Sequence, residues 1–282
     1  RYTPVEMMRT LREASRHCYL LESASQTEVW GRYSFLGYEP VMEITCTDGI
    51  MKIRRTEGAD KEEITKQVAH PGDTLREILK EYKSPVMEDM PPFTGGLVGY
   101  FSYDYIKYSE PKLKLGEHED PDFRDMDLML FDQVIAFDHY RQKVLLITGV
   151  MLDDLEKSYQ KAEKKLQEMV DLIRDGEKEE FPSLKLASEI KPQFPKEKYC
   201  DMVEKAKHYI HEGDIFQVVL SNPMRAKAEG SLFDTYRVLR ATNPSPYMFY
   251  FSSDDIELAG ASPETLVKLE DKKLTTFPLA GT

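Results

Sequence analysis

The stretch Met42-Glu43-Ile44-Thr45-Cys46-Thr47-Asp48-Gly49-Ile50-Met51-Lys52-Ile53 decides the fold. Apolar and polar residues alternate on both sides of Asp48-Gly49, and such a pair between two alternating runs is a strong signal for a β-hairpin. A second hairpin is expected from residues 128–138 and 143–148. Residues 1–150 are therefore predicted to form a β-rich portion of the protein.

Helical periodicity follows this β-rich portion. Between residues 152 and 176, apolar side chains recur at three- and four-residue spacing, which is typical of a helix with one buried face. Residues 177–198 combine charged residues with prolines and are the best linker candidate. A second helix is expected over residues 197–211, with Gly213 as its stop.

The remainder of the chain mixes both kinds of element. Strands are expected at residues 215–221, 247–251, 265–269 and 274–277, and a helix at 231–241. The predicted class is α+β, with large layered sheets and helices. Its expected parts are residues 1–150, a helix and linker at 151–195, and the start of a second domain at 196–282.

Composition excludes some functions and partners. The 50 acidic and 38 basic residues give a net charge of −12, and the basic residues do not cluster, so nucleic acid is not an expected partner. The three cysteines form no metal-binding spacing, which is typical of a reducing compartment. No apolar run of about 18 residues is present, so we expect no membrane partner and a cytoplasmic location.

Short segments along nearly the whole chain resemble the signatures of one enzyme family, in the family's order. The chain is similar to the large subunit of anthranilate synthase, a chorismate-utilising enzyme, with much of the catalytic domain expected beyond Thr282. The resemblance is carried by Leu20-Leu21-Glu22-Ser23, Gly31 to Gly37, Phe93 to Asp104, Val134 to His139, Gly213 to Val219, Asn243-Pro244-Ser245-Pro246-Tyr247-Met248, Ala261-Ser262-Pro263-Glu264 and Pro278-Leu279-Ala280-Gly281-Thr282.

Gln217 is the first candidate catalytic residue. An inward-facing amide in an apolar strand needs hydrogen-bond partners, so a structural role is the simplest interpretation from the residue alone. The resemblance implies a further role, because related enzymes that add water to chorismate carry Lys at this position as a general base. Ammonia needs no such base, since its lone pair is already available.

Glu264 is the second candidate. Its position in a turn would suit an exposed carboxylate, whereas the resemblance implies the general acid that protonates the departing 4-hydroxyl of chorismate. Gly281 and Thr282 are implied to contact chorismate through backbone amides and the hydroxyl, although a simple turn would also suit them. Ala280 lacks the reactive group of the covalent lysine found in many aminodeoxychorismate synthases, which favours anthranilate as product.

Two other segments are implied to form an effector site. Leu21, Glu22 and Ser23, together with Pro246, Tyr247 and Met248, resemble the two halves of the family's tryptophan pocket. Apolar side chains suit the indole ring, and Ser23 with backbone groups can hydrogen-bond the amino-acid head. Without the resemblance, the two segments would be interpreted as a strand end and a proline-rich turn.

The resemblance implies a reaction and its partners. Chorismate and ammonia give anthranilate and pyruvate, the first step of tryptophan biosynthesis, with ammonia from a glutamine amidotransferase subunit and tryptophan as feedback inhibitor. Mg²⁺ is the implied cofactor, and its ligands are expected beyond residue 282, so no metal ligand is assigned in this chain. The chain alone is expected to be inactive. Two alternatives remain, an aminodeoxychorismate synthase without the covalent lysine and a non-catalytic tryptophan-binding module.

Two further features receive structural interpretations. Gly95-Gly96 and Gly99 lack the Lys-Ser/Thr of a phosphate-binding loop, so close packing of backbone is the better explanation. His139 is expected to stabilise the fold and is assigned no catalytic role.

Overall fold

The computed structural model describes residues 2–24, 31–56, 62–110, 112–113, 115 and 123–278. Contacts divide the chain into two compact units, residues 1–180 with 236–282, and residues 181–235. Helices and strands are mixed, as the predicted α+β class requires. The units differ from the boundaries expected near residues 150 and 195, because residues 247–262 join a sheet that begins near the N-terminus.

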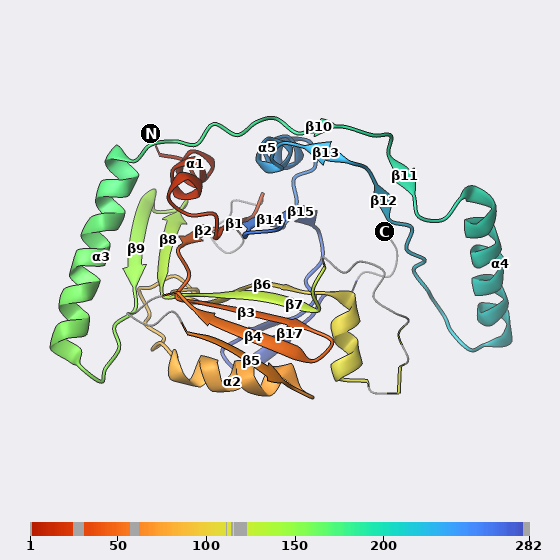
Figure 1. The fold of residues 1–282 in the computed structure, drawn as a ribbon, viewed down its shortest axis with the longest axis horizontal. Helices are drawn as coiled ribbons and strands as arrows, with labels where there is room; N and C mark the ends of the chain where they lie inside the picture. The colour runs from red at the N-terminus through yellow and green to blue at the C-terminus, as the bar shows by residue number, and fades with distance from the viewer. Residues whose placement is uncertain are drawn as a thin grey trace. The chain divides into compact units, whose positions relative to one another are not determined.

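A five-stranded antiparallel sheet lies in the larger unit, in the order β5-β4-β3-β7-β6 (Figure 1). The predicted hairpin of residues 42–53 is confirmed as β3 and β4 of this sheet. Asp48 and Gly49 have φ values of 50° and 76°, the left-handed conformation that such a two-residue turn requires. The strands are β3 (Met42–Thr47), β4 (Ile50–Arg55), β5 (Glu63–Gln67), β6 (Gly96–Phe101) and β7 (Met126–Phe131).

The second sheet of this unit has six strands in the order β15-β14-β1-β2-β8-β9, and its paired strands are all antiparallel. Its centre joins β1, near the N-terminus, to β14, more than 200 residues later. The strands are β1 (Cys18–Glu22), β2 (Tyr33–Tyr38), β8 (Gln133–Asp138), β9 (Lys143–Thr148), β14 (Tyr247–Ser252) and β15 (Glu257–Ser262).

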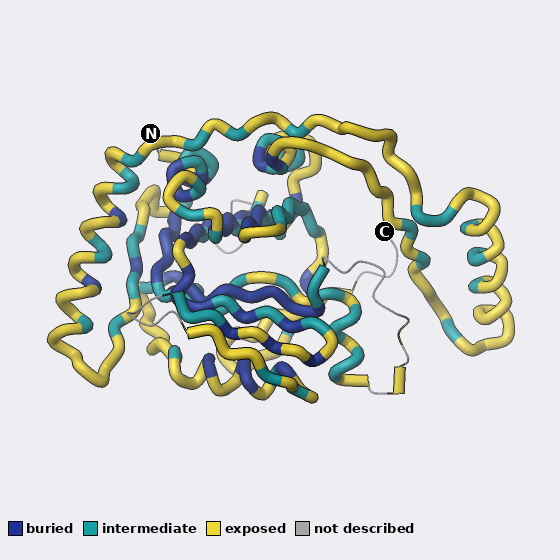
Figure 2. Tube along the Cα trace, in the orientation of Figure 1, coloured by how far each residue is buried: buried dark blue, intermediate teal, exposed yellow. Residues whose placement is uncertain are grey.

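Alternation along β7 shows how the two sheets pack. Met126, Leu128 and Leu130 pack with Leu75 and Ile78 of α2 (Pro71–Glu81), which covers the outer face of the five-stranded sheet (Figure 1). Met129 and Phe131 point to the opposite face and pack with Tyr19 and Phe251 of the six-stranded sheet. Figure 2 shows buried residues concentrated where the sheets face each other. The core of the larger unit therefore lies on both faces of the five-stranded sheet.

Helices α1, α3 and α5 lie against the six-stranded sheet. Helix α1 (Pro4–Ala14) is capped by Thr3, whose hydroxyl accepts a hydrogen bond from the Glu6 backbone N–H, and the helix contacts β1 and β2. Helix α3 (Leu155–Asp175) packs on β9 and confirms the helix predicted for residues 152–176. Helix α5 (Phe233–Thr242) confirms the helix predicted at 231–241 and carries the buried Tyr236. A short 3-10 helix occupies Tyr103–Tyr108.

The smaller unit consists of two short strand pairs and one helix. Strand β10 (Lys185–Leu186) pairs with β13 (Ala228–Glu229), and β11 (Lys191–Pro192) pairs with β12 (Met224–Arg225). Helix α4 (Lys196–Glu212) confirms the helix predicted at 197–211, and Gly213 ends it with a left-handed φ of 83°. No described helix of the chain is long and apolar enough to cross a membrane.

Three strand predictions differ from the structure. The run 128–138 was expected to be one arm of a hairpin, but it divides at Asp132 into β7 and β8, which belong to different sheets. Residues 215–221 form no strand, and Phe216 is 99% exposed. The strands expected at 265–269 and 274–277 are shorter and shifted, as β16 (Lys268–Glu270) and β17 (Lys273–Thr275).

The prediction of close backbone packing at the glycine cluster is confirmed. Gly99 has a φ of 157°, and a Cβ atom there would lie 2.0 Å from the carbonyl oxygen of Asp127 on β7. Gly95 has a φ of 144°, and a Cβ would lie 2.9 Å from the carbonyl oxygen of Phe131. Larger residues would push β6 and β7 apart.

Candidate functional site

The two segments that resemble halves of an effector pocket lie side by side. Strands β1 and β14 pair antiparallel, with Leu21 opposite Phe249 and Glu22 opposite Met248. The pairing extends past the strand ends, because the Ala24 N–H donates to the carbonyl oxygen of Ser245 at 3.0 Å. More than 220 residues separate Ser23 from Tyr247 in the sequence. The sheet topology therefore places both segments at one end of the six-stranded sheet.

Glu22 is the charged residue at the centre of this arrangement. Its buried carboxylate accepts hydrogen bonds from Tyr236 Oη at 2.7 Å and from Arg240 Nε at 2.5 Å, both on α5. Burial and the adjacent carboxylate raise the pKa of Tyr236. The Leu21-Glu22-Ser23 segment is therefore fixed to the helix that leads directly to Pro246-Tyr247-Met248.

His139 lies close enough to Glu22 and Arg240 to interact with their charges. Its Nε2 atom is 2.7 Å from the hydroxyl oxygen of Ser34, and its backbone N–H donates to Arg32 at 2.9 Å. Burial lowers the pKa of the imidazole. These contacts agree with the structural role expected for His139.

Glu264 follows β15 and lies close to the Tyr247 segment in the fold. Tyr247 is opposite Ser262 in the β14–β15 pairing, and its phenol oxygen lies 2.5 Å from the hydroxyl of Thr265, the next residue after Glu264. The Glu264 N–H donates to Ser262 Oγ at 3.3 Å in a tight turn. Glu264 is exposed, whereas Thr265 is buried. The structure thus brings the expected acid and one expected effector segment onto the same hairpin.

Of the other predicted catalytic residues, only Gln217 falls within the described part of the chain. Gln217 lies in the smaller unit, exposed and outside any strand, so the described residues do not give its amide the apolar surroundings expected from the sequence. Gly281 and Thr282 lie outside the described residues, as does Ala280. Pro246 is exposed and Met248 is buried, so only part of the expected apolar wall faces solvent.

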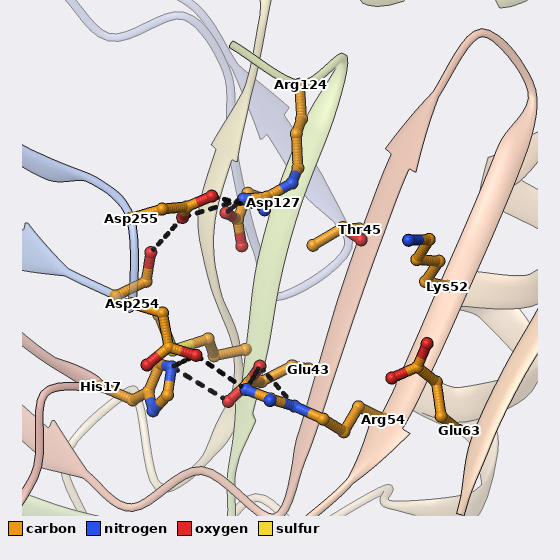
Figure 3. Close-up of a pocket in the computed structure, with 12 residues that line it drawn as sticks. His17, Glu43, Thr45, Lys52, Arg54, Glu63, Arg124, Asp127, Asp254 and Asp255 are labelled. Atoms are coloured by element: carbon orange, nitrogen blue, oxygen red, sulfur yellow. Dashed lines mark hydrogen bonds and ion pairs between the residues drawn. The ribbon is translucent and has the colours of Figure 1, made fainter. Parts of the chain in front are cut away.

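A charged cleft of about 180 Å³ lies at the opposite end of β14, and sequence reasoning missed it (Figure 3). On the face of the five-stranded sheet turned away from α2, β3 and β4 present Glu43, Thr45, Lys52 and Arg54. The sequence signal was this row of polar residues on one face of a hairpin whose other face is buried. Such a row of polar residues ordinarily indicates a sheet face exposed to solvent. In this structure, the row faces the β14–β15 turn across the cleft.

Two arginines bridge this cleft. Arg124 donates to Asp127 on β7 at 2.8 Å and to Asp255 in the β14–β15 turn at 2.6 Å. Arg54 joins Glu43 on β3 to Asp254 in the same turn. Burial raises the pKa of Asp127 to about 6, and Arg124 opposes that rise. Asp254 and Asp255 are therefore each connected, through an arginine, to a carboxylate of the five-stranded sheet.

The motifs and the fold agree with a match to one protein family. Residues 16–282 match the family described as chorismate binding enzyme, and the chain therefore belongs to this family.

Within the family, the chain is similar to proteins named anthranilate synthase component 1. It is 34% identical over 293 residues to the protein of that name from Aquifex aeolicus strain VF5, covering 99% of this chain and 56% of that protein. The corresponding protein of Bacillus subtilis strain 168 is 35% identical over 301 residues, covering 99% and 56%. The chain thus spans about half the length of these relatives.

A solved structure supports the same relationship. The crystal structure of anthranilate synthase component I from Streptococcus pneumoniae TIGR4 superposes with a TM-score of 0.72 at 32% identity. The match covers 87% of this chain and 53% of that chain. The layered sheet-and-helix architecture is therefore that of an anthranilate synthase component I.

Proposed function

We propose that the protein containing this chain is the aminating large subunit of anthranilate synthase. It would convert chorismate and ammonia to anthranilate, pyruvate and water. Ammonia adds at C2 as the 4-hydroxyl leaves, and loss of the enolpyruvyl group as pyruvate makes the ring aromatic. The observation that carries the proposal is the similarity over 99% of the chain to proteins named anthranilate synthase component 1.

Residues of this chain have distinct roles in the proposal. Glu264 protonates the departing hydroxyl, and Gln217 occupies the position where a basic residue would otherwise activate water. Gly281 and Thr282 contact the substrate. Ala280 offers no nucleophile, which favours anthranilate over products formed through a covalent lysine.

Mg²⁺ belongs to the proposal, but no residue of this chain is assigned to it. Among the described residues, the one group of His, Cys, Asp and Glu at ligand spacing is His17, Glu43 and Asp254. A histidine does not suit Mg²⁺, which prefers oxygen ligands. The proposal places the Mg²⁺ ligands beyond Thr282, where the family resemblance implies them.

Regulation by tryptophan and supply of ammonia by a glutamine amidotransferase subunit are also proposed. The pairing of β1 with β14 supports the first, because it joins the two segments that resemble an effector pocket. An effector held by both segments would contact the hairpin that carries Glu264. It could then change activity by binding two states of the enzyme with different affinity.

Complementation tests the proposed reaction. A bacterial strain that requires tryptophan because it lacks this subunit should grow without tryptophan when it expresses the full-length protein. The Glu264→Gln variant should fail, and anthranilate supplied in the medium should restore growth in both cases. Failure of the wild-type protein in a strain that anthranilate rescues would contradict the proposal.

A further inference from the structure

We propose that His17, Glu43 and Asp254 form a binding site for one divalent transition-metal ion of the zinc class. This site is separate from the activity proposed above. The three side chains come from distant parts of the sequence: the residue before β1, strand β3 and the β14–β15 turn. Figure 3 shows them converging at one end of the charged cleft. No sequence motif predicts this meeting.

The spacing of the potential ligand atoms suits a single ion. His17 Nε2 lies 3.2 Å from Glu43 Oε1 and 3.4 Å from Asp254 Oδ2. One atom from each residue lies within 4.8 Å of the others. Ligands placed about 2.1 Å from a tetrahedral ion are about 3.4 Å apart, so these distances need little adjustment. The fourth position would face the cleft and take water or a small ligand.

Glu43 provides an independent indication. Its Oε1 atom is buried and, among the described residues, accepts no hydrogen bond of acceptable direction, although His17 Nε2 is close. A buried carboxylate oxygen without a hydrogen-bond donor is destabilising, and a cation bound to it would compensate for the missing donor. The His17 and Glu43 side chains are 17% and 14% exposed, whereas Asp254 is 57% exposed and leaves a route from solvent.

Arg54 currently bridges the two carboxylates. Its guanidinium contacts Glu43 and lies 3.1 Å from Asp254 Oδ2, and it is 43% exposed. With a neutral imidazole, Glu43, Asp254 and Arg54 sum to one negative charge. A divalent ion in place of Arg54 would neutralise the two carboxylates. Arg54 can turn into solvent, so it acts as an internal competitor that weakens binding without preventing it.

The donor set determines the class of ion. One imidazole nitrogen with two carboxylate oxygens suits Zn²⁺, Co²⁺ and similar ions, whereas Mg²⁺ and Ca²⁺ prefer oxygen donors alone. Binding would connect the β14–β15 turn to β3 through the ion. The far end of the same hairpin carries Tyr247 and Ser262, so the ion would brace the hairpin from the end opposite to Glu264.

Titration of the metal-free chain with Co²⁺ tests the site, because four-coordinate Co²⁺ absorbs visible light strongly. We expect one ion per chain, displaced by Zn²⁺. His17→Ala and Glu43→Gln should each weaken binding about 10-fold or more, since loss of a ligand costs at least as much as loss of its supporting contacts. Arg54→Met should tighten binding because the competing charge is gone.

A matched control separates this site from surface histidines. His208 lies 3.9 Å from Glu212 on the exposed face of α4, and His208→Ala should leave binding unchanged. Circular dichroism of each variant without metal shows whether it is folded. If His17→Ala is unfolded, Co²⁺ binding by Arg54→Met, compared with wild type, tests the proposal instead. The proposal is overturned if wild type and Arg54→Met give no absorption, if His17→Ala binds like wild type when folded, or if His208→Ala abolishes binding.

Discussion

The phenol oxygen of Tyr247 lies 2.5 Å from the hydroxyl oxygen of Thr265. This contact joins a residue of the proposed effector segment to the residue that follows the proposed general acid, Glu264. Effector binding can influence chemistry only through contacts that differ between two states of the enzyme. The Tyr247–Thr265 hydrogen bond directly connects the two segments in this structure.

Removing the Tyr247 hydroxyl should weaken this link. In the full-length enzyme, Tyr247→Phe should make tryptophan inhibition about fivefold weaker, because a hydrogen bond contributes about 1 kcal/mol. The measurement is the tryptophan concentration that halves the rate. Tyr250→Phe is the control on the same strand, since its hydroxyl donates to Glu257 instead. Equal effects of the two substitutions would argue against a specific link.

Filling the proposed effector pocket should abolish inhibition. Ser23→Phe places a large ring between the paired segments, so tryptophan should no longer inhibit while uninhibited turnover remains nearly intact. Steady-state rates at increasing tryptophan measure both quantities. Ser84→Phe, at an exposed position, should behave like wild type. An inhibition curve unmoved by Ser23→Phe would show that residues 20–23 have only a structural role.

Replacing the proposed acid should reduce turnover selectively. Glu264→Gln keeps the size and polarity of the side chain but removes its proton, so kcat with ammonia should fall about 10²–10⁴-fold, with a smaller change in KM. Glu270→Gln removes another exposed carboxylate, on β16, and should leave kcat unchanged. A normal rate for Glu264→Gln would remove Glu264 from the mechanism.

The Arg32–Asp138 pair should make stability depend on pH in the acid range. Arg32 Nη2 donates to the buried Asp138 carboxylate at 2.7 Å, and this pair lowers the pKa of Asp138 to about 2. The folded state therefore binds fewer protons than the unfolded state between about pH 2 and 4. The contribution of Asp138 to stability should rise with pH across that window and stay constant above it.

Asp138→Asn tests this pH dependence by urea unfolding. The free energy of unfolding of the variant should be about 2 kcal/mol lower at neutral pH. It should also rise less steeply with pH between about pH 2 and 4. Asp171→Asn is the control, because its pair with Arg174 is half exposed and should contribute less than about 1 kcal/mol. If Asp138→Asn leaves the pH dependence of the unfolding free energy between about pH 2 and 4 unchanged, other groups are responsible for it.

Local sequence signals predicted local structure well. Alternation and the Asp48-Gly49 pair indicated the β3–β4 hairpin, and three- and four-residue spacing indicated α3 and α4. The same signals failed at residues 128–138. Both faces of β7 and β8 are buried, so no alternation marks the change of sheet at Asp132.

Contacts between distant segments were beyond local patterns. The pairing of β1 with β14 followed from no periodicity, and only the family resemblance indicated that residues 21–23 and 246–248 belong together. The Glu22–Arg240 contact and the group of His17, Glu43 and Asp254 depend on that same topology. Such groups cannot be inferred until the order of strands in the sheet is known.

The most direct test of the proposed function is the identity of the aminated product. Full-length protein is incubated with chorismate, Mg²⁺ and isotopically labelled ammonium, and the products are separated and identified by mass spectrometry. We predict labelled anthranilate and an equal amount of pyruvate, with neither formed by residues 1–282 alone. Accumulation of labelled 4-amino-4-deoxychorismate, or of isochorismate without label, would contradict the account.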